Sequence, residues 1–168
     1  GTTVPSWLSF NSSTGALTGT PLNTHVGNHD VVITATDESS SSVTQSFTIV
    51  VVNTNDAPST LNVTATTLED NSVALTLSGT DVDSGDSITY SIVSNPSSGS
   101  LGSVSGSSVT YTPNSNFNGS DTFTYKVTDV SGVDSNTSTA TITITAVNDA
   151  PVSADGSVTT AEDTAVNV

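Results

Sequence analysis

A four-residue motif, Asn-Asp-Ala-Pro, occurs at 55–58 and again at 148–151, and this repetition constrains the fold more than any other feature of the chain. The two copies are 93 residues apart (148 − 55). The same offset aligns Thr-Leu-Glu-Asp at 67–70 with Thr-Ala-Glu-Asp at 160–163, without a gap between the two matches. Self-similarity at a fixed offset indicates tandem structural units.

The repeat divides the chain into three segments. Residues 55–148 form one complete unit, and residues 149–168 are the beginning of a further copy, in which we expect the N-terminal strands of that unit. Residues 1–54 belong to a related but different unit. Only about half a sandwich lies there, with strands expected around 31–35 and 47–51, so an apolar sheet face and unpaired edges would be exposed unless something outside the sequence completes it.

Alternation of apolar and polar residues predicts an all-β fold. Apolar side chains recur with a period of two, and Thr fills most of the opposite face, as in antiparallel sheets with one wetted side. No segment has a helical stripe. We therefore expect tandem antiparallel β-sandwiches of the cadherin or Ig type with Greek-key connections. The residues that carry the pattern in the complete unit are Val73, Leu75, Leu77, Ile88, Tyr90, Ile92, Val109, Tyr111, Phe123, Tyr125, Val127, Ile142 and Ile144.

The charge balance excludes several classes of partner. The chain has 16 acidic residues and a single cation, Lys126, which gives a net charge of −15. Nucleic acids and anionic membranes both require several Lys or Arg residues, so neither is expected as a partner. No apolar run approaches the length of about 18 residues needed to cross a membrane, so no membrane insertion of this segment is expected. There is no Cys, so disulfides and thiolate metal sites are impossible, and bound calcium is the crosslink that remains to stabilise the fold.

Most of the acidic residues are predicted to lie in turns at strand ends. Asp81 and Asp83 end one strand, Asp129 ends another, and Asn55 and Asp56 form the connection from the preceding unit. In a sandwich these three places meet at the same end. Calcium takes about six to eight oxygen ligands, and a carboxylate cluster without a cation would repel itself. We therefore predict a calcium site here.

A second group of acids is expected at the opposite end of the complete unit. Glu69 and Asp121 would meet the next connection, Asn148 and Asp149. In the first unit, Asp30 is expected in the place of Asp121, because it precedes Asp37 by seven residues while Asp121 precedes Asp129 by eight. Each junction would thus gather acids from both neighbouring units.

The complete unit resembles the cadherin-like repeats of giant bacterial surface proteins and large adhesins. The resemblance covers residues 55–148 and rests on the segment 80–90, on Thr128-Asp129, and on the segment 111–125. Residues 1–52 resemble an Ig-like, dystroglycan-type cadherin module, in which roughly 40 further residues would precede the Trp. The resemblance implies calcium at the linkers between domains. Its matching residues are Asn55, Asp56, Asp81, Asp83 and Asp129 on one side and Glu69 and Asp149 on the other. An acid pair of animal cadherins is reduced here to Asp121.

Three other features have chemical interpretations that the pattern does not favour. His25 and His29 flank a turn without a third zinc ligand, so we interpret them as loop residues. Trp7 and Phe10 are more typical of core packing than of a sugar-binding platform. Lys126 is expected to point outward, because residues on either side of it in the strand face the core. This orientation argues against an isopeptide bond from Lys126.

The sequence contains no constellation of catalytic residues, and we predict that the segment is not an enzyme. Our main hypothesis is a calcium-stabilised extender or stalk module of a secreted or cell-surface adhesin or fibre. Its partners would be neighbouring repeats or copies of the same protein. Two alternatives stay open: a module that binds an extracellular glycan or surface protein, and a fibre subunit assembled by β-strand donation between copies.

Overall fold

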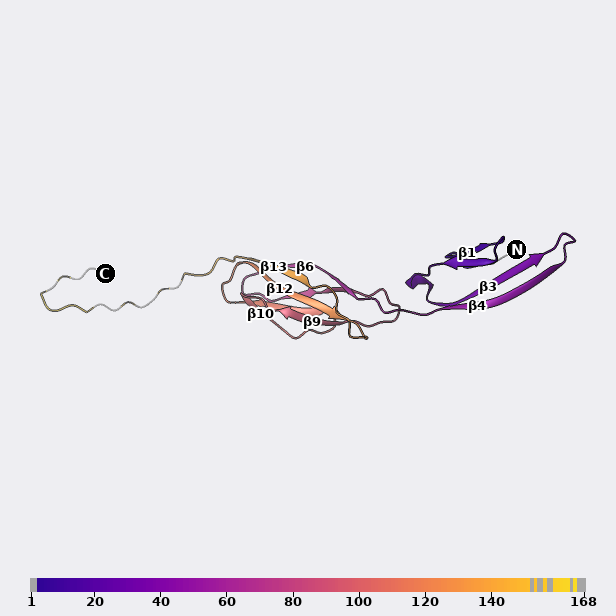
Figure 1. Cartoon of the computed structure of the whole chain (residues 1–168). Helices are drawn as coiled ribbons and strands as arrows, with labels where there is room; N and C mark the ends of the chain where they lie inside the picture. The colour runs from indigo at the N-terminus through magenta and orange to yellow at the C-terminus, as the bar shows by residue number, and fades with distance from the viewer. Residues whose placement is uncertain (1–2, 152, 154–155, 157–158, 164, 166–168) are drawn as a thin grey trace.

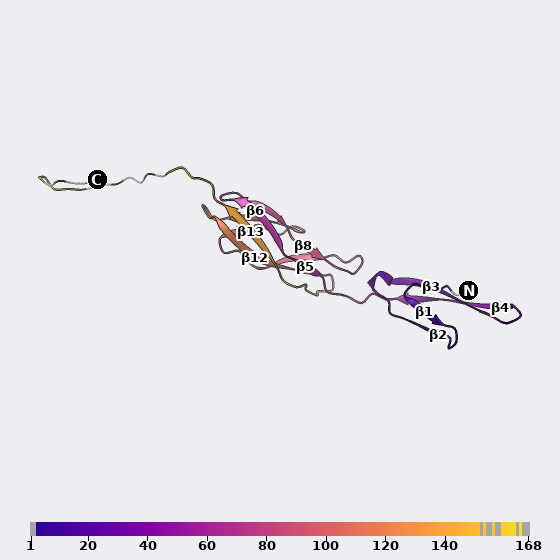
Figure 2. The same ribbon diagram turned by 90° about the horizontal axis from the view of Figure 1, so that it is seen from above.

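The chain is known as a computed structural model, which describes residues 3–151, 153, 156, 159–163 and 165. Within these residues it has thirteen β-strands and one short 3-10 helix. Figures 1 and 2 show the strands gathered into two bodies, joined by the extended segment 52–58. No helix of the described part is long and apolar enough to cross a membrane.

The complete unit is a sandwich of strands that face each other across a core. One sheet has the order β6-β13-β12-β9 and the other has the order β10-β11-β7, with a short β5-β8 pair beside them. Every pairing is antiparallel except that of β13 with β6. The strands are β5 (Ser59–Leu61), β6 (Val63–Leu68), β7 (Val73–Thr76), β8 (Ser78–Thr80), β9 (Thr89–Ser94), β10 (Gly99–Leu101), β11 (Ser108–Pro113), β12 (Gly119–Thr128) and β13 (Ser138–Thr145).

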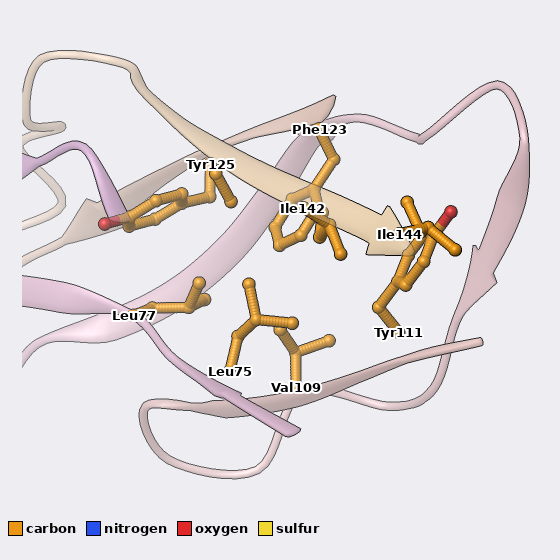
Figure 3. Packing of buried hydrophobic residues seen from close by; sticks show 9 residues of the cluster. Leu75, Leu77, Val109, Tyr111, Phe123, Tyr125, Ile142 and Ile144 are labelled. Carbon is orange, nitrogen blue, oxygen red and sulfur yellow. The ribbon is translucent and has the colours of Figure 1, made fainter. Parts of the chain in front are cut away.

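The core of the sandwich confirms the alternation read from the sequence. Along β11 and β12 every second residue is buried, and the residues between them face solvent more. Figure 3 shows buried side chains of the cluster gathered between the strands. Each large apolar side chain removed from water contributes about 1.5–3 kcal/mol. The buried cluster consists of Leu75, Leu77, Val109, Tyr111, Phe123, Tyr125, Ala140, Ile142 and Ile144.

The first unit is far less complete. It has two separate two-stranded sheets, β1-β2 and β3-β4, and one isolated bridge pairs Thr3, before β1, with Val32 of β3. Among its described residues, only Val31 is a buried hydrophobic residue. Its other apolar side chains are half-buried or exposed. Its elements are β1 (Leu8–Asn11), β2 (Ala16–Gly19), η1 (Asn23–His25), β3 (Gly27–Thr36) and β4 (Ser42–Val51).

The further copy begins with the same turn as the complete unit. Asp70 and Asp163, which are 93 residues apart, both have a left-handed backbone, with φ of 62° and 59°. Each of them closes a turn that starts at the preceding Glu. None of the described residues from 149 onward is in a strand, and the expected strands of this copy fall largely on residues outside the described part.

Candidate metal centre

Five of the predicted site residues meet at the end of the sandwich that faces the first unit. Asp81 and Asp83 follow β8, Asp129 follows β12, and Asn55 and Asp56 lie in the linker before β5. The Asn55 amide donates to Asp129 Oδ2 at 2.8 Å. The backbone N–H of Asp56 donates to Asp83 Oδ2 at 2.7 Å, and that of Asp83 donates to Asp81 Oδ1 at 2.9 Å. Linker and sandwich are thus tied through carboxylates.

Two oxygens of this group have no hydrogen-bond donor. Asp81 Oδ2 and Asp83 Oδ1 are both buried without a partner. The whole Asp83 residue is only 4% exposed. A buried carboxylate oxygen that loses water without gaining a donor is costly, because the negative charge is left uncompensated. The oxygens are of the hard type that Mg²⁺ and Ca²⁺ prefer, so the donor set fits a divalent cation.

The pKa values of the neighbouring carboxyl groups reflect the same crowding. The pKa of Asp86 is raised, first by desolvation and then by the negative charges of Asp81, Asp83 and Asp129. The pKa of Asp129 is lowered, mainly because the Asn55 amide donates to its carboxylate, with help from backbone N–H groups of the following turn. Asp86 therefore experiences the repulsion, whereas Asp129 is compensated by donors.

The first unit contacts this centre through a residue that the sequence did not single out. The amide of Asn23, in η1, donates to Asp56 Oδ2 at 2.6 Å. A cavity of about 620 Å³ lies beside the contact, lined by Leu22, Asn23, Thr24, Asp56, Val82 and Ser84. Asn23 carries no spacing signal, since only the packing of η1 against the linker brings it to Asp56.

In the described part of the chain, no group of three or more His, Asp or Glu side chains already meets in a metal-ligating geometry. The carboxylates of the centre instead turn part of their oxygens toward amides of the chain itself. What the arrangement offers is therefore a set of close oxygens, two of them unpartnered, rather than a finished coordination sphere.

The acids at the opposite end of the sandwich have other partners. Glu69 is buried and accepts hydrogen bonds from the backbone N–H of Val147 at 2.5 Å and from the amide of Asn118 at 3.2 Å. It therefore holds the start of the next connection. The amide of Asn148 donates to the carbonyl of Asp149.

Asp121 is already well supplied with donors. Burial alone would raise its pKa, but the N–H groups of Ser98 and Ser97, the Tyr111 hydroxyl and the Thr122 N–H outweigh that effect and lower it. The Tyr111 hydroxyl donates at 2.9 Å. This carboxylate ties the turn at 97–98 to the core.

Asp30 does not occupy the place of Asp121, contrary to the expectation from residue spacing. Aligning Gly27 of β3 with Gly119 of β12 brings His29, not Asp30, opposite Asp121. Asp30 is exposed on the other face of β3, where the Thr48 hydroxyl donates to it at 2.7 Å. The one-residue difference moves the side chain to the other face because strand residues alternate.

The remaining candidate residues pack together or form pairs. Trp7 is half-buried and stacks on His25, with ring centroids 5.8 Å apart, and meets His29 edge-on at 5.5 Å. His25 Nδ1 accepts the Leu22 N–H and His29 Nε2 contacts the His25 carbonyl, so one nitrogen of each ring is engaged. Lys126 forms an ion pair with Asp134.

Comparison with solved structures shows the cadherin and Ig type of sandwich. The EC1-2 fragment of human protocadherin-24 matches with a TM-score of 0.52 at 14% identity, covering 88% of this chain and 81% of that one. Extracellular cadherin domains 3–6 of protocadherin gamma B2 match with a TM-score of 0.53 at 14% identity, covering 88% of this chain and 40% of that one. At this identity the likeness concerns the fold.

An endo-fucoidan hydrolase of glycoside hydrolase family 107 matches with a TM-score of 0.45 at 20% identity, covering 87% of this chain. This chain spans only about a quarter (23%) of that enzyme's length. No curated protein matches the sequence.

Two family descriptions match the sequence directly. The family described as "Putative Ig domain" matches residues 1–52. The family described as "Bacterial Ig domain" matches residues 55–145. Because this second match spans more than half of the chain, the chain belongs to the bacterial Ig domain family.

Proposed function

We propose that this chain is an extender segment of a secreted or cell-surface bacterial protein, and that calcium stiffens the joint between its units at residues 52–58. The family and the cadherin-like fold are typical of extracellular modules that act by position rather than by chemistry. Its partners would be neighbouring repeats or copies of the same protein. In this role the segment is not catalytic.

One observation carries the calcium proposal: the unpartnered buried oxygens of Asp81 and Asp83. Their burial in a chain of net charge −15 is unfavourable without a cation. Calcium ligands of this kind are carboxylates, amide carbonyls and backbone oxygens, which the linker and the turns both provide.

The residues that would hold the ion come from both sides of the joint. Asp81, Asp83 and Asp129 belong to the sandwich, and Asn55 and Asp56 belong to the linker that leaves β4. A bound cation would tie these carboxylates together and would offset their repulsion of Asp86, which adds to desolvation in raising the pKa of that group. The linker would then lose rotational freedom relative to the sandwich.

A second site at Asn148 and Asp149 is part of the same proposal, in a reduced form. Glu69 borders that connection, because it holds the Val147 N–H. Asp121 has a structural use of its own, since its oxygens accept from Ser97, Ser98, Tyr111 and Thr122. We therefore expect Glu69 and Asp149 to contribute more to this site than Asp121, and the first joint to bind calcium more tightly.

Calcium titration by isothermal calorimetry at neutral pH tests the proposal. Extracellular modules bind calcium with dissociation constants of about 10⁻⁴ to 10⁻³ M. A tenfold excess over such a constant stabilises the folded state by about 1.4 kcal/mol per site. Asp83→Asn is expected to weaken the tightest site at least tenfold, because it removes the charge of a buried ligand.

Glu38→Gln is the matched control, since it removes one charge at an exposed position in the β3-β4 turn. It should leave the affinity within about twofold, since only screened long-range charge is lost. If the wild-type chain binds no calcium up to 10 mM, on the order of ten times the weaker expected constant, or if both variants bind as the wild type does, calcium at this joint is refuted.

A further inference from the structure

The outer face of the four-stranded sheet carries a regular set of hydroxyl side chains. In β6, β13 and β12 alternate residues pack against the core, so the residues between them point outward. Eight neighbouring outward positions hold only Thr or Ser. These eight residues, named here the hydroxyl grid, are Thr64 and Thr66 of β6, Thr139, Thr141 and Thr143 of β13, and Ser120, Thr122 and Thr124 of β12.

The register of the sheet aligns the hydroxyl grid in rows that cross the strands. Figure 2 shows β6, β13 and β12 side by side, and the pairings of β13 with both neighbours run without a register shift. A shift does separate β9 from β12, so the regular part of the face ends at β12. The rows are Thr64 with Thr141 and Thr122, Thr66 with Thr143 and Ser120, and Thr139 with Thr124.

The hydroxyl grid is uncharged although the chain has a net charge of −15. The only acidic residue in β6, β12 and β13 is Asp121, which is buried on the opposite face. Lys126, two residues beyond the grid in β12, forms an ion pair with Asp134. The aromatic residues of these three strands, Phe123 and Tyr125, are buried in the core. The face therefore offers a partner neither charge nor an aromatic platform.

Most hydroxyls of the grid are free to contact a partner. Among the described residues, only the Thr124 hydroxyl of the grid forms a side-chain hydrogen bond, with the Ser94 hydroxyl at 2.6 Å. All eight grid residues are exposed or half-buried. Each hydroxyl can donate one hydrogen bond and accept others, and each Thr also presents a methyl group that restricts the orientation of nearby water.

The spacing of the hydroxyl grid follows from the geometry of a β-sheet. Successive outward side chains of one strand are about 6.4–6.8 Å apart, and neighbouring strands are about 4.7–4.9 Å apart. Such regularity gives no advantage toward an irregular partner, but it does toward a partner that repeats at similar distances. The water oxygens on the prism faces of ice repeat at two distances close to these.

We propose that the hydroxyl grid adsorbs to ice by holding water in the pattern of the ice lattice. Ice is neutral and its surface is a repeating array of hydrogen-bond donors and acceptors, which matches an uncharged array of hydroxyls. A second protein copy matches less well, since stable protein interfaces involve about 20–30 residues on each side and the grid has eight. Because β-sheets twist, the match extends over a few rows, so we expect weak adsorption rather than a strong depression of the freezing point.

Partition into slowly growing ice tests the proposal. Isotope-labelled wild-type chain and an unlabelled variant are mixed in equal amounts, part of the solution is frozen, and mass spectrometry gives their ratio in the ice. Thr141→Lys, in the middle of a row, should be depleted several-fold relative to the wild type, because its long side chain keeps the row away from the lattice. Thr122→Lys, in the same row on β12, should be depleted in the same way.

Thr110→Lys is the matched control, because it adds the same charge at an exposed position of the other sheet. Thr110 lies on β11 opposite Ala74, outside the hydroxyl grid. It should enter ice as the wild type does, and the melting temperature of each variant shows that it is folded.

Three outcomes would overturn the proposal: ice that excludes the wild-type chain as fully as it excludes serum albumin, equal depletion of Thr141→Lys and Thr110→Lys, or exclusion from ice together with binding to cellulose that Thr141→Lys abolishes. The hydroxyl grid shares no residue with the calcium centre, so the two proposals fail separately.

Discussion

Asp86 is the residue at which the electrostatic state of the joint is easiest to measure. Its pKa is raised by desolvation and by Asp81, Asp83 and Asp129. A carboxyl group with a raised pKa in the folded state destabilises the fold when it is charged, and this cost disappears as the pH falls through its folded-state pKa and below the unfolded value of about 3.9.

We therefore predict that Asp86→Asn raises the melting temperature by a few degrees at pH 7 in the presence of a chelator. The gain should shrink toward pH 4, where wild-type Asp86 takes up a proton, and it should also shrink in saturating calcium. Differential scanning calorimetry between pH 4 and 7.5 measures both trends. A variant that melts at the wild-type temperature in chelator at pH 7 would contradict the assigned repulsion.

For individual residues, the sequence predicts which of them lie in turns at the same edge, but not which groups they contact. Asp81, Asp83 and Asp129 were expected together because each follows a strand that ends at the same edge, and they do meet there. The partners of Asp121 were not predictable, because two of them are backbone N–H groups of the turn at 97–98. Asn23 was missed for the same reason, since its contact depends on how η1 packs on the linker.

Among the elements, strands with large apolar residues on one face were predictable and short Ser/Thr strands were not. β7, β9, β11, β12 and β13 coincide with the alternating patterns of the sequence. β6 has the sequence VTATTL, whose inner positions are small, and β10 is only three residues long. Such strands form because they pair with the edge of a neighbouring strand. Their own sequence therefore does not reveal them.

The β10-β11 pair gives a test at the scale of elements. A Cβ added at Gly99 would lie 2.5 Å from the ring of Tyr111, which is buried in the core. We predict that Gly99→Ala destabilises the complete unit by about 1–3 kcal/mol through overpacking. Gly102 is the matched control, because its added Cβ would meet Thr110 at 3.7 Å, an ordinary contact.

Urea unfolding of the two variants, followed by tyrosine fluorescence, measures the difference. Gly102→Ala should stay within about 0.5 kcal/mol of the wild type, as surface substitutions usually do. Equal losses in both variants would mean that the close approach of β10 to the Tyr111 ring does not limit packing.

For the whole molecule, the repeat predicts where the units divide, but it carries no information on how they contact each other. The 93-residue offset placed the boundaries at the two linkers, and the copy of the Glu-Asp turn at 162–163 reproduces the backbone of 69–70. The contact between η1 and the linker has no counterpart in the repeat pattern, because residues 1–54 belong to a different kind of unit. The geometry of the joint is thus a property of this particular pair of units.

The stiffness of that joint is the property on which an extender depends. Without a cation, the side-chain hydrogen bond described from the first unit to the linker runs from Asn23 to Asp56, while Asp81 and Asp83 keep unpartnered oxygens. An exposed hydrogen bond contributes about 0.5–1.5 kcal/mol, too little to hold two bodies in one orientation. Several carboxylate oxygens around one cation would hold the joint more firmly than this hydrogen bond does.

We therefore predict that calcium narrows the distribution of distances between the two bodies. Spin labels at Ser39→Cys and Ser103→Cys report this distance by pulsed electron paramagnetic resonance. Both positions are exposed and far from the joint in sequence, and the chain has no other Cys. The distribution should be broad in chelator and narrow in 10 mM calcium, on the order of ten times the expected dissociation constant. Adding Asp83→Asn should keep it broad at both calcium levels, whereas Glu38→Gln should not. If calcium binds by calorimetry and yet leaves the distribution unchanged, the ion stabilises the sandwich alone, and the stiffness must come from the packing of η1 on the linker.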